Sequence, residues 1–526
     1  MSLVFAAISA IAAIVICLSL VYFLAAMLAG MHELRKGKTK LAVQGDTTYG
    51  KPFESEPATF DTYFLIPGLN EAAVISQTVA SLTGGKRSTV IMIDDGSDDD
   101  TAALAEAAGG DDTIVLRRVA PNARQGKGEA LNDAYRLVER LVTERGQDPE
   151  KVLICVMDAD GKLSDGAMSH VLPLFDDPTV GGVQLAVRIR NRRTNFLTSF
   201  QDFQFWSMSA ITQFGRKKTG TVSLGGNGQF TRLSALQELG GLPWSSSLTE
   251  DLDLALSLAT SGWKLDTTPF ASVDQQAVES LKRLIIQRRR WYQGHMTAGK
   301  RIVDVWRDPT LNNARALELS AYLAVPWLFD LPWSILWHWT LYGFITNAGS
   351  VFSYVTGWQS AIIGGFLWYV LTFAPSLMTT TVYFRRDRRV GLPRAILMGH
   401  AFLVMNYLSF ICAWGALYRM IRGRTGWDKT VRVVEGEAGA AAPAAGATPA
   451  RRATTLVVEA EAPVAAGPAI ESAPSAASAS DDVSENAQVV PTIAAPAPIT
   501  VVTPALPVMK RDRQRLRARV TAGVAA

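Results

Sequence analysis

Short apolar runs alternate with helix-like stretches and with turns rich in glycine and aspartate over residues 55–275. Four of the runs are typical of buried strands, because each is apolar and ends in polar or acidic side chains. They lie at residues 63–66, 89–93, 114–116 and 152–157. This alternation predicts an α/β domain with an open parallel sheet. Ligands of such sheets bind beyond the carboxyl ends of the strands, so we expect the acidic loops to meet at one crevice.

A long apolar segment precedes this domain. Residues 2–30 carry no charged side chain, and a membrane-spanning helix needs roughly 20 apolar residues. A cleaved signal peptide would have a basic start and a shorter apolar stretch. Arg35, Lys36, Lys38 and Lys40 follow directly. The segment at residues 1–32 is therefore predicted to be a transmembrane helix that begins outside, with the α/β domain in the cytosol.

The chain beyond the domain is expected to return to the membrane. Residues 276–312 are amphipathic and arginine-rich, which favours helices along the membrane surface. Residues 313–420 contain three apolar blocks that predict transmembrane helices, at about 317–345, 358–384 and 395–418. Basic segments beside membrane helices normally stay in the cytosol, and we call this the charge rule. If each block crosses the membrane once, the basic segment 422–432 ends outside, against this rule. A hairpin in the first block would instead leave residues 385–389 outside, so one block is expected to be re-entrant or interfacial.

The end of the chain differs in composition from the rest. Residues 421–434 are predicted to form a cytosolic loop. Residues 435–526 are rich in alanine, proline, serine and valine, and this composition predicts a disordered tail. The tail closes with a basic stretch from Lys510 to Arg519, which could contact anionic lipid or be merely solvated.

Composition narrows the class of protein. A hydrophobic share of 48% and a mean hydropathy of +0.13 over 526 residues favour a membrane protein of two or three domains. The net charge is +4 and the basic residues lie in short clusters, which disfavours nucleic acid as the main partner. Cys17, Cys155 and Cys412 show neither CxxC spacing nor a nearby histidine pair, so zinc, iron–sulfur and disulfide frameworks lack support.

Two carboxylates follow the fourth strand-like run, in Asp158-Ala-Asp160. At a strand end they could hold Mg²⁺ or Mn²⁺ and bridge it to a diphosphate, because these cations prefer oxygen ligands. An acidic turn that caps the next helix is the alternative. An EF-hand is excluded, because Lys162 takes the place of the third acidic ligand.

Polar groups also follow the first two runs. Asn70-Glu71 and Asp94-Asp95 end adjacent strands, where they could bind a nucleobase and ribose. Helix N-capping explains such turns equally well. Lys127 precedes a predicted helix, where its ammonium could meet phosphate oxygens or simply be solvated.

Thr249-Glu250-Asp251 begins another helical run. Ser247 and Glu250 have the spacing of a capping box. In the functional interpretation, Asp251 is a general base that takes the proton of an acceptor hydroxyl as a sugar's anomeric carbon is attacked. A single displacement of this kind inverts the anomer. The five histidines form no cluster in the sequence and receive no catalytic role.

The arginine-rich segment contains Gln287-Arg-Arg-Arg290-Trp291. The guanidinium of Arg290 can bind a phosphate through two hydrogen bonds, and the indole of Trp291 can stack on a sugar ring. The alternative is an interfacial helix whose arginines reach lipid headgroups beside a tryptophan of the aromatic belt.

These motifs, in this order, resemble those of the processive family-2 glycosyltransferases, such as the cellulose, hyaluronan and poly-N-acetylglucosamine synthases. The resemblance covers roughly residues 60–430 and includes Gly-Gly-Asn-Gly at 225–228. It implies a GT-A, Rossmann-like cytosolic domain fused to an α-helical transmembrane region of the cell membrane. It further implies a UDP-sugar donor, Mg²⁺ or Mn²⁺, and an inverting enzyme that polymerises the sugar into a β-linked polysaccharide and translocates the growing glycan across the bilayer. Accessory export proteins would be further partners.

The resemblance also implies residue roles. Glu71 and Asp95 would contact the uridine, Asp158 the nucleotide and Asp160 the metal. The expected substrate-binding set also includes Asn70, Asp94 and Lys127. Asp251, beside Glu250, would be the base. Gln287, Arg290 and Trp291 would hold the diphosphate and the acceptor end of the polymer. The segment 427–432 would be a loop that closes over the donor.

Departures from the family pattern narrow the choice. The gating Phe-x-Val-Thr-x-Lys segment is not visible, and Arg513 and Arg517 are not followed by Asp-x-Ser-x-x-Gly. A cellulose synthase is therefore disfavoured, and nothing in the sequence fixes the sugar or linkage. Non-processive transfer of one sugar to a lipid carrier is an alternative that Trp291 disfavours. A catalytically inactive membrane scaffold is a second alternative, disfavoured because Asp160 and Asp251 are both present.

Overall fold

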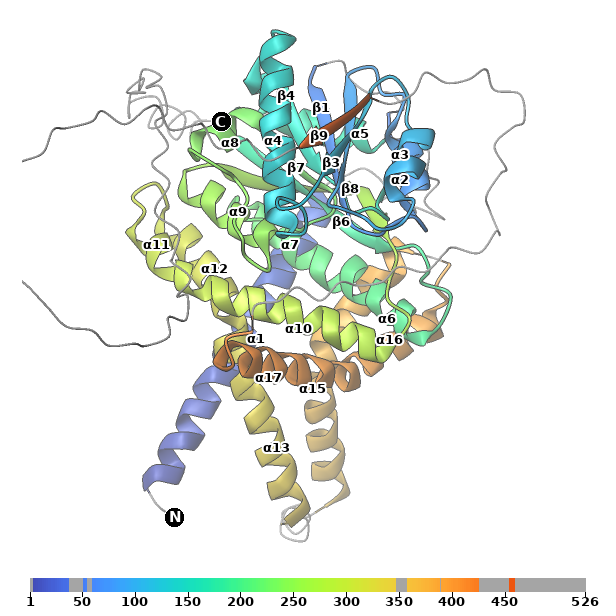
Figure 1. The fold of residues 1–526 in the computed structure, drawn as a ribbon. Helices are drawn as coiled ribbons and strands as arrows, with labels where there is room; N and C mark the ends of the chain where they lie inside the picture. The colour runs from blue at the N-terminus through green and yellow to red at the C-terminus, as the bar shows by residue number, and fades with distance from the viewer. Residues whose placement is uncertain are drawn as a thin grey trace, which may run out of the picture. The chain divides into compact units, whose positions relative to one another are not determined.

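A mixed β-sheet forms the centre of the chain in the computed structural model (Figure 1). The residues that the structure describes are 3–36, 51–53, 59–346, 357–387, 389–424 and 454–458. Among them the sheet has nine strands in the order β5-β8-β6-β7-β4-β1-β2-β3-β9. Their bounds are β1 Asp61–Gly68, β2 Ser88–Asp94, β3 Thr113–Arg118, β4 Val152–Val156, β5 Lys162–Leu163, β6 Val180–Ile189, β7 Gln229–Arg232, β8 Lys264–Gln275 and β9 Thr454–Val458.

The four predicted runs form β1 to β4, and these strands pair in parallel. Burial on both faces explains their continuous apolar sequence; every residue of β2 is buried. Alternate residues enter different cores, with Ile66 packed on one face of the sheet and Leu65 on the other. The sheet as a whole is mixed and not wholly parallel, because β7 runs antiparallel to β4 and β6.

Helices cover both faces of the sheet (Figure 1). One core packs under α2, α3 and α5, and the other under α4, α8 and α9. These helices are α2 Ile75–Leu82, α3 Thr101–Ala108, α4 Lys127–Glu144, α5 Ala167–Val171, α8 Leu233–Glu238 and α9 Glu250–Thr260. Because α4 and α9 begin near the carboxyl ends of the parallel strands, their first residues face the expected crevice.

A buried ionic cluster joins the sheet to the long apolar helices α1, α13 and α15, which we call the membrane-type helices, through the end of α15. It links β6 with α6 (Phe196–Phe203) and with the end of α15 (Trp358–Arg386). Arg188 on β6 forms ion pairs with Asp202 and Asp387, and the hydroxyl of Tyr383 donates to Asp202 Oδ2 at 2.7 Å. All four residues are buried. The next helices, η3 Gln204–Ser209 and α7 Ala210–Lys217, continue toward α1 (Leu3–Lys36).

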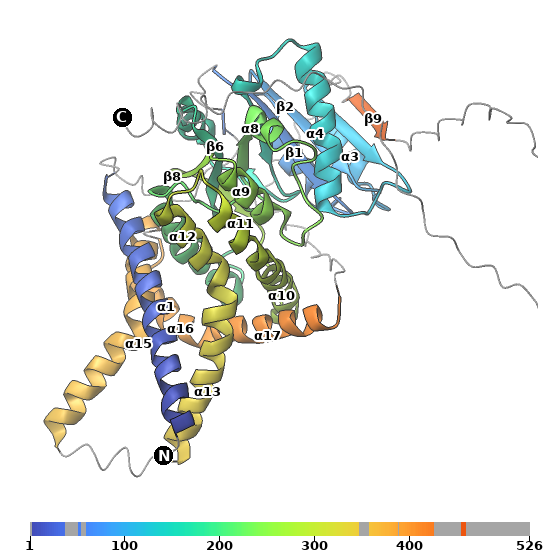
Figure 2. The same cartoon turned by 90° about the vertical axis from the view of Figure 1, so that its left-hand side faces the viewer.

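Three stretches of the described residues are long and apolar enough to cross a membrane: Cys17–Arg35, Asn313–Trp339 and Leu392–Ile421. In Figures 1 and 2, α1, α13 and α15 extend from one side of the α/β part. The helices of the C-terminal region are α10 Leu281–Ala298, η4 Gly299–Arg301, α11 Ile302–Arg307, α12 Asn313–Ala324, η5 Val325–Asp330, α13 Leu331–Thr346, α15, α16 Leu392–Met405 and α17 Tyr407–Ile421.

The third apolar block is divided into α16 and α17 near Asn406. Helix α17 lies along α10 and does not descend with α13 and α15 (Figures 1 and 2). Arg419 Nε donates to Gln293 Oε1 at 2.8 Å, and Gln293 Nε2 donates to the carbonyl of Arg424 at 2.6 Å. The second half of the third apolar block thus runs beside the amphipathic α10.

The expected tail at 435–526 lies outside the described residues except for Thr454–Val458. These residues form β9, which pairs in parallel with β3, so the prediction of disorder is wrong for them. The segment 427–432, expected to close over the donor, and the basic stretch from Lys510 to Arg519 also lie outside the described residues.

Candidate active site

Lys127 is the centre of a charged cluster built from three separate segments. As the first residue of α4, it donates from Nζ to Asp158 Oδ1 at 2.8 Å and to the carbonyl of Gly226 at 3.2 Å. Its Nζ also lies 3.8 Å from Glu250 Oε1, at the start of α9. The predicted site residues Lys127, Asp158 and Glu250 therefore meet at the carboxyl end of β4, as the sheet geometry led us to expect.

Asp251 belongs to the same cluster. Its Oδ1 accepts from the backbone N–H of Leu252 at 2.7 Å, and Lys127 acts on its charge. Gly226 lies close to Lys127 and Asp251. A Cβ at this position would lie 2.7 Å from Lys127 Nζ and 3.6 Å from Asp251 Oδ2. Any side chain at position 226 would displace the lysine, which explains a glycine in the Gly-Gly-Asn-Gly motif.

Burial shifts the protonation of the cluster. It raises the pKa of Glu250 to about 7, although the charge of Lys127 acts in the opposite direction. Burial raises the pKa of Asp251 as well, again against Lys127. Arg290 of α10 lowers the pKa of both carboxyls through its charge. The predicted base and the predicted diphosphate-binding arginine therefore share one electrostatic environment.

Lys127 itself stays charged. Burial lowers its pKa, but Asp158, Glu250 and Asp251 outweigh this effect and raise the pKa above its ordinary value. An ammonium that compensates three carboxylates is a different role from the expected contact with phosphate, and the phosphate contact stays a prediction.

Helix α10 packs directly on the start of α9. A Cβ at Gly294 would lie 2.4 Å from Cγ2 of Thr249, so only glycine allows this approach. The capping box, the alternative interpretation of Ser247 and Glu250, is not formed: Thr249 is the N-cap residue and makes no side-chain cap bond. Ser247 Oγ accepts from the N–H of Thr249 at 3.3 Å. The Thr-Glu-Asp segment is thus held by contact with α10.

The two carboxylates of Asp-x-Asp have different surroundings. The side chain of Asp158 is 29% exposed and faces Lys127. Asp160 is 1% exposed, and its Oδ2 accepts from the backbone N–H of Gln276, at the end of β8, at 2.8 Å. No group of three or more His, Cys, Asp or Glu side chains among the described residues could hold a metal. The metal role of Asp160 stays a prediction.

The loops after β1 and β2 are joined to each other. Asn70 has a left-handed backbone with φ of 54°, and its N–H donates to Ser97 Oγ at 2.9 Å. In return its Oδ1 accepts from the N–H of Asp98 at 2.8 Å. The N–H of Glu71 donates to Thr101 Oγ1 at 2.7 Å. These bonds hold the two loops together at the strand ends.

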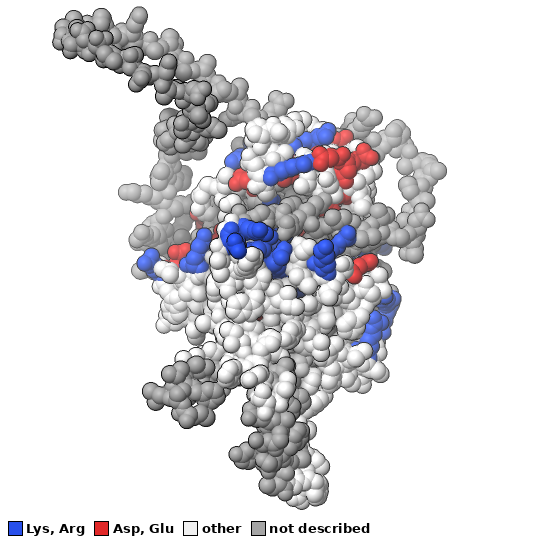
Figure 3. All heavy atoms as spheres, turned by 60° about the horizontal axis from the view of Figure 1, so that its bottom comes forward, with Lys and Arg blue, Asp and Glu red and all other residues white. Residues whose placement is uncertain are grey.

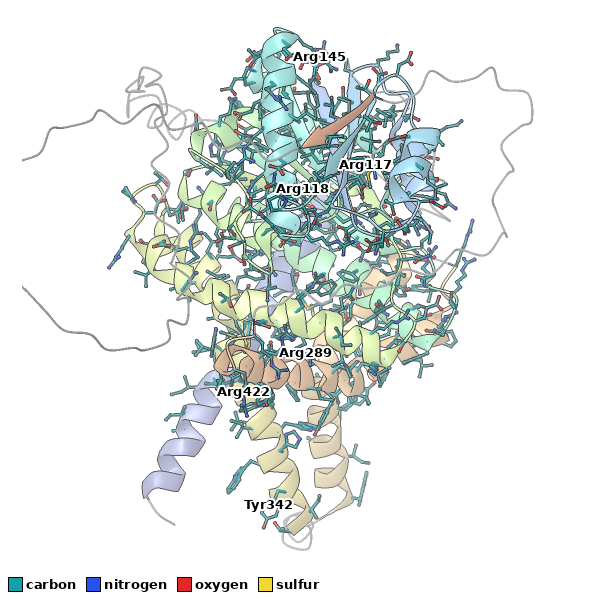
Figure 4. All side chains as sticks on the ribbon, in the orientation of Figure 1. Arg117, Arg118, Arg145, Arg289, Tyr342 and Arg422 are labelled. Carbon is teal, nitrogen blue, oxygen red and sulfur yellow. The ribbon has the colours of Figure 1, made fainter. Side chains whose placement is uncertain are left out.

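A cavity of about 450 Å³ lies beside these loops, at the ends of β2 and β3. Its walls include Asp94, Arg117, Arg118 and Arg124, and Figure 4 shows Arg117 and Arg118 there. Arg118 forms an ion pair with Asp95. Burial raises the pKa of Asp95, while the Arg124 N–H and Arg118 act to lower it.

Sequence reasoning missed these arginines. The only available signal was that two of them end a strand-like run. The structure nevertheless places the expected donor-binding residues Asn70, Glu71, Asp94 and Asp95 together, at the carboxyl ends of β1 and β2.

The predicted Gln287, Arg290 and Trp291 lie on α10. Gln287 is buried, and Trp291 is half-buried with its ring edge-on to Phe205 at 6.2 Å between ring centres. The guanidinium of Arg288, which the sequence analysis left out, lies 4.9 Å from the centre of the Trp291 ring. The indole is therefore already in contact with a cation, and this limits how much of its face a sugar can use.

Comparison with known proteins bears on this site. Residues 57–294 match the family described as Glycosyltransferase like family 2. The beta-monoglucosyldiacylglycerol synthase of Trichormus variabilis is 34% identical over 204 residues, which are 38% of this chain and 39% of the relative. The probable glucomannan 4-beta-mannosyltransferase 11 of Arabidopsis thaliana is 26% identical over 144 residues, 27% of this chain and 32% of the relative. The chain thus spans at most about two fifths of the length of these relatives.

Among solved structures, the mannosyltransferase PcManGT from Pyrobaculum calidifontis, in complex with GDP-Man and Mn²⁺, aligns with a TM-score of 0.43 and 17% identity. The alignment covers 74% of this chain and 99% of that chain.

Proposed function

Because residues 57–294 match the family described as Glycosyltransferase like family 2, we propose that the protein is a membrane-bound, inverting hexosyltransferase. It would transfer a sugar from a nucleotide-sugar donor to the hydroxyl of a lipid in the membrane. The observation that carries this proposal is the cluster of Lys127, Asp158, Glu250 and Asp251, with Arg290 acting on the same carboxyls. It combines a candidate base with cations suited to a diphosphate leaving group.

Asp251 is the proposed base. Its carboxylate takes the proton of the acceptor hydroxyl while the acceptor oxygen bonds to the anomeric carbon and the nucleotide diphosphate leaves with its electron pair. A base is most effective when its pKa approaches the working pH, and burial raises the pKa of Asp251 in that direction. The charge of Lys127 lowers the pKa of Asp251 and so keeps a fraction of the Asp251 carboxyls ionised. Because no protein nucleophile takes part, the anomer is inverted.

The leaving diphosphate is proposed to meet cations from two sides, Lys127 on α4 and Arg290 on α10. Preorganised cations of this kind stabilise charge that develops in the transition state. Asp158 and Asp160 are the proposed holders of Mg²⁺ or Mn²⁺, with Asp158 offering the accessible oxygens. Such a cation needs only one or two protein carboxylates when the substrate phosphates complete its ligands. When bound, it would neutralise charge on the diphosphate.

The nucleoside is proposed to occupy the cavity at the ends of β2 and β3. Its walls offer the arginine and carboxylate groups that recognise ribose hydroxyls and base edges. A UDP-sugar is the proposed donor, because Glu71 and Asp95 stand at the positions that the motif assigns to uridine.

A lipid acceptor is favoured by the name of the relative of highest identity given above, a glucosyldiacylglycerol synthase. Polymerisation into a β-glycan remains a second candidate, because Trp291 completes the Gln-x-x-Arg-Trp motif and the glucomannan transferases are also relatives. Translocation of a polymer stays a prediction of the family resemblance.

We further propose a multi-pass topology with the sheet in the cytosol. In this topology α1, α13 and α15 cross the bilayer and α10 and α17 lie at its surface. Both basic segments, around Arg385 and Arg422, then stay on the cytosolic side, as the charge rule requires. In the view of Figure 3, lysine and arginine side chains gather in a band, with a largely uncharged surface on the side of the membrane-type helices.

The proposal is tested with the purified full chain in lipid nanodiscs that contain diacylglycerol. UDP-glucose, UDP-N-acetylglucosamine and GDP-mannose are offered in turn with Mn²⁺. Nucleotide release and a sugar-labelled product that partitions into organic solvent are the expected results. A water-soluble, high-mass labelled product would instead establish the polymer synthase. Absence of nucleotide release with every donor would refute both and favour the inactive scaffold.

A further inference from the structure

Polar residues recur every four positions along α13 and the turn before it: Asp330, Ser334, His338 and Tyr342. This spacing places them on one helix face. The segment is one of the stretches apolar enough to cross a membrane. Polar groups inside such a segment are costly and mark functional sites by default, so this face needs an explanation that the catalytic cluster does not supply.

The stripe begins beside the candidate active site. Tyr292, the residue after Trp291 on α10, lies close enough to Asp330 for the two side chains to interact electrostatically. One turn further, Ser334 Oγ accepts from Trp414 Nε1 of α17 at 2.8 Å. The next member, His338, is hydrogen-bonded to the hydroxyl of Tyr407. The stripe therefore faces α17 and leads away from Trp291 along α13.

An open groove of about 450 Å³ lies along this stripe. It is lined by Ser334, Ile335, His338, Trp339, Tyr342 and Trp414. The walls are broad and accessible: Trp339 is 59% exposed, Tyr342 63% and Trp414 45%. Figure 4 shows Tyr342 toward the far end of α13 and Arg289 where α10 meets α17.

We infer that this groove between α13 and α17 binds the acceptor lipid and holds it with its hydroxyl toward Trp291 and Asp251. The inference rests on the proposed function, which it extends to a site and a class of acceptor. The groove is open along its side and its walls are aromatic and aliphatic, so an acyl chain can enter laterally from the bilayer. The polar groups at its base are held by hydrogen bonds within the protein, Ser334 with Trp414 Nε1 and His338 with the Tyr407 hydroxyl, and these bonds fix the position of the groove walls.

The chemistry of the groove favours a neutral lipid over a phosphorylated carrier. None of the six lining residues is lysine or arginine. Asp330, one turn closer to α10, adds a carboxyl group and no cation for a phosphate. A lipid such as diacylglycerol carries a free hydroxyl without a charge and needs no such cation.

Binding is tested separately from catalysis. The full chain in nanodiscs is illuminated with a photoreactive diacylglycerol, without donor, and the labelled peptides are identified. Label is expected on α13 and α17. The double variant Trp339→Ala and Tyr342→Ala should reduce labelling about tenfold, because the loss of each aromatic contact weakens lipid binding about threefold.

Two further variants keep the test decisive. Ile335→Trp fills the groove from an exposed position and should reduce labelling while the protein remains folded. Trp337→Ala removes an exposed tryptophan of α13 outside the groove and should leave labelling unchanged. In the transfer assay, the groove variants should raise the KM for lipid and leave the KM for the nucleotide sugar unaltered.

The outcomes separate this inference from the proposed function. Glycolipid synthesis with labelling unaffected by the groove variants would overturn the groove and leave the function standing. Groove-dependent labelling without any transfer would leave the lipid site standing and overturn the enzyme. Preferential labelling by a photoreactive polyprenyl phosphate or by an oligosaccharide would contradict the neutral-lipid acceptor.

Discussion

Replacing Lys127 by methionine tests the electrostatic core of the candidate site. The change keeps most of the side-chain volume but removes the ammonium that lies 2.8 Å from Asp158 and 3.8 Å from Glu250. An opposite charge at such distances shifts the pKa of a carboxyl by about 1–3 units. Lys127 lowers the pKa of both Glu250 and Asp251, so its removal should raise both.

The expected result is an upward shift of about 1–2 units in the acid limb of the pH profile of kcat/KM, because Asp251 acts as a base only when ionised. Such a shift corresponds to about 1.4–2.7 kcal/mol. The variant should also lose about 2–3 kcal/mol of stability, at or below the usual cost of leaving a buried charge without its partner. Nucleotide release measured from pH 5 to about pH 9 follows the first effect, and chemical denaturation follows the second.

Two controls support the interpretation. Lys127→Arg keeps the charge and should leave the acid limb near its original position. Lys162→Met removes a lysine whose Nζ donates to Gln77 Oε1 at 2.8 Å; it should change neither quantity. An unmoved acid limb together with a raised KM for the donor would refute the electrostatic effect on Asp251 and leave Lys127 only the role of a phosphate ligand.

Further predictions concern other parts of the site. Asp251→Asn should abolish transfer while the thermal midpoint is retained, and residual activity with an unchanged pH profile would remove Asp251 from the role of base. Trp291→Ala should raise the KM for the acceptor about five- to tenfold, since an aromatic contact is worth about 1 kcal/mol; an effect on the donor KM alone would contradict this. Gly294→Ala should destabilise by about 1–3 kcal/mol through collision with Thr249, although Ala is normally favoured over Gly in a helix, and Thr249→Ala should restore part of the loss. Because burial raises the pKa of Glu250 from 4.5 to about 7, its contribution to stability is complete below pH 4.5 and is lost as the pH rises through 7. Glu250→Gln should flatten that decline in denaturation curves, and an unchanged slope would show that Glu250 does not cause it.

The sequence predicted β1 to β4 because those strands are apolar on both faces. It did not predict β6, whose buried polar residues interrupt an apolar pattern. Gln184 of β6 is buried and donates to the carbonyl of Asn227 at 2.8 Å, and Arg188 is buried in the ionic cluster. Such residues resemble surface positions until their partners, distant in the chain, are known.

The candidate site likewise has features that the sequence predicted and features that it did not. Motif order placed Lys127, Asp158 and Glu250 correctly at one end of the sheet, because parallel strands present their carboxyl ends together. It did not indicate that Asp160 would turn toward Gln276, or that Arg288 would contact Trp291. Those details depend on β8 and on packing around α10, neither of which leaves a local pattern in the sequence.

The ionic cluster around Arg188 has a practical consequence for anyone who wishes to isolate the soluble half. A fragment that stops at residue 294 would lack Asp387 and Tyr383, the partners that α15 and the loop after it contribute to Arg188 and Asp202. The guanidinium would then be left beside a tryptophan, Trp206, with half of its counter-charge missing. Expression of the sheet by itself is thus expected to fail for reasons of folding, and any inactivity of such a fragment would say nothing about catalysis.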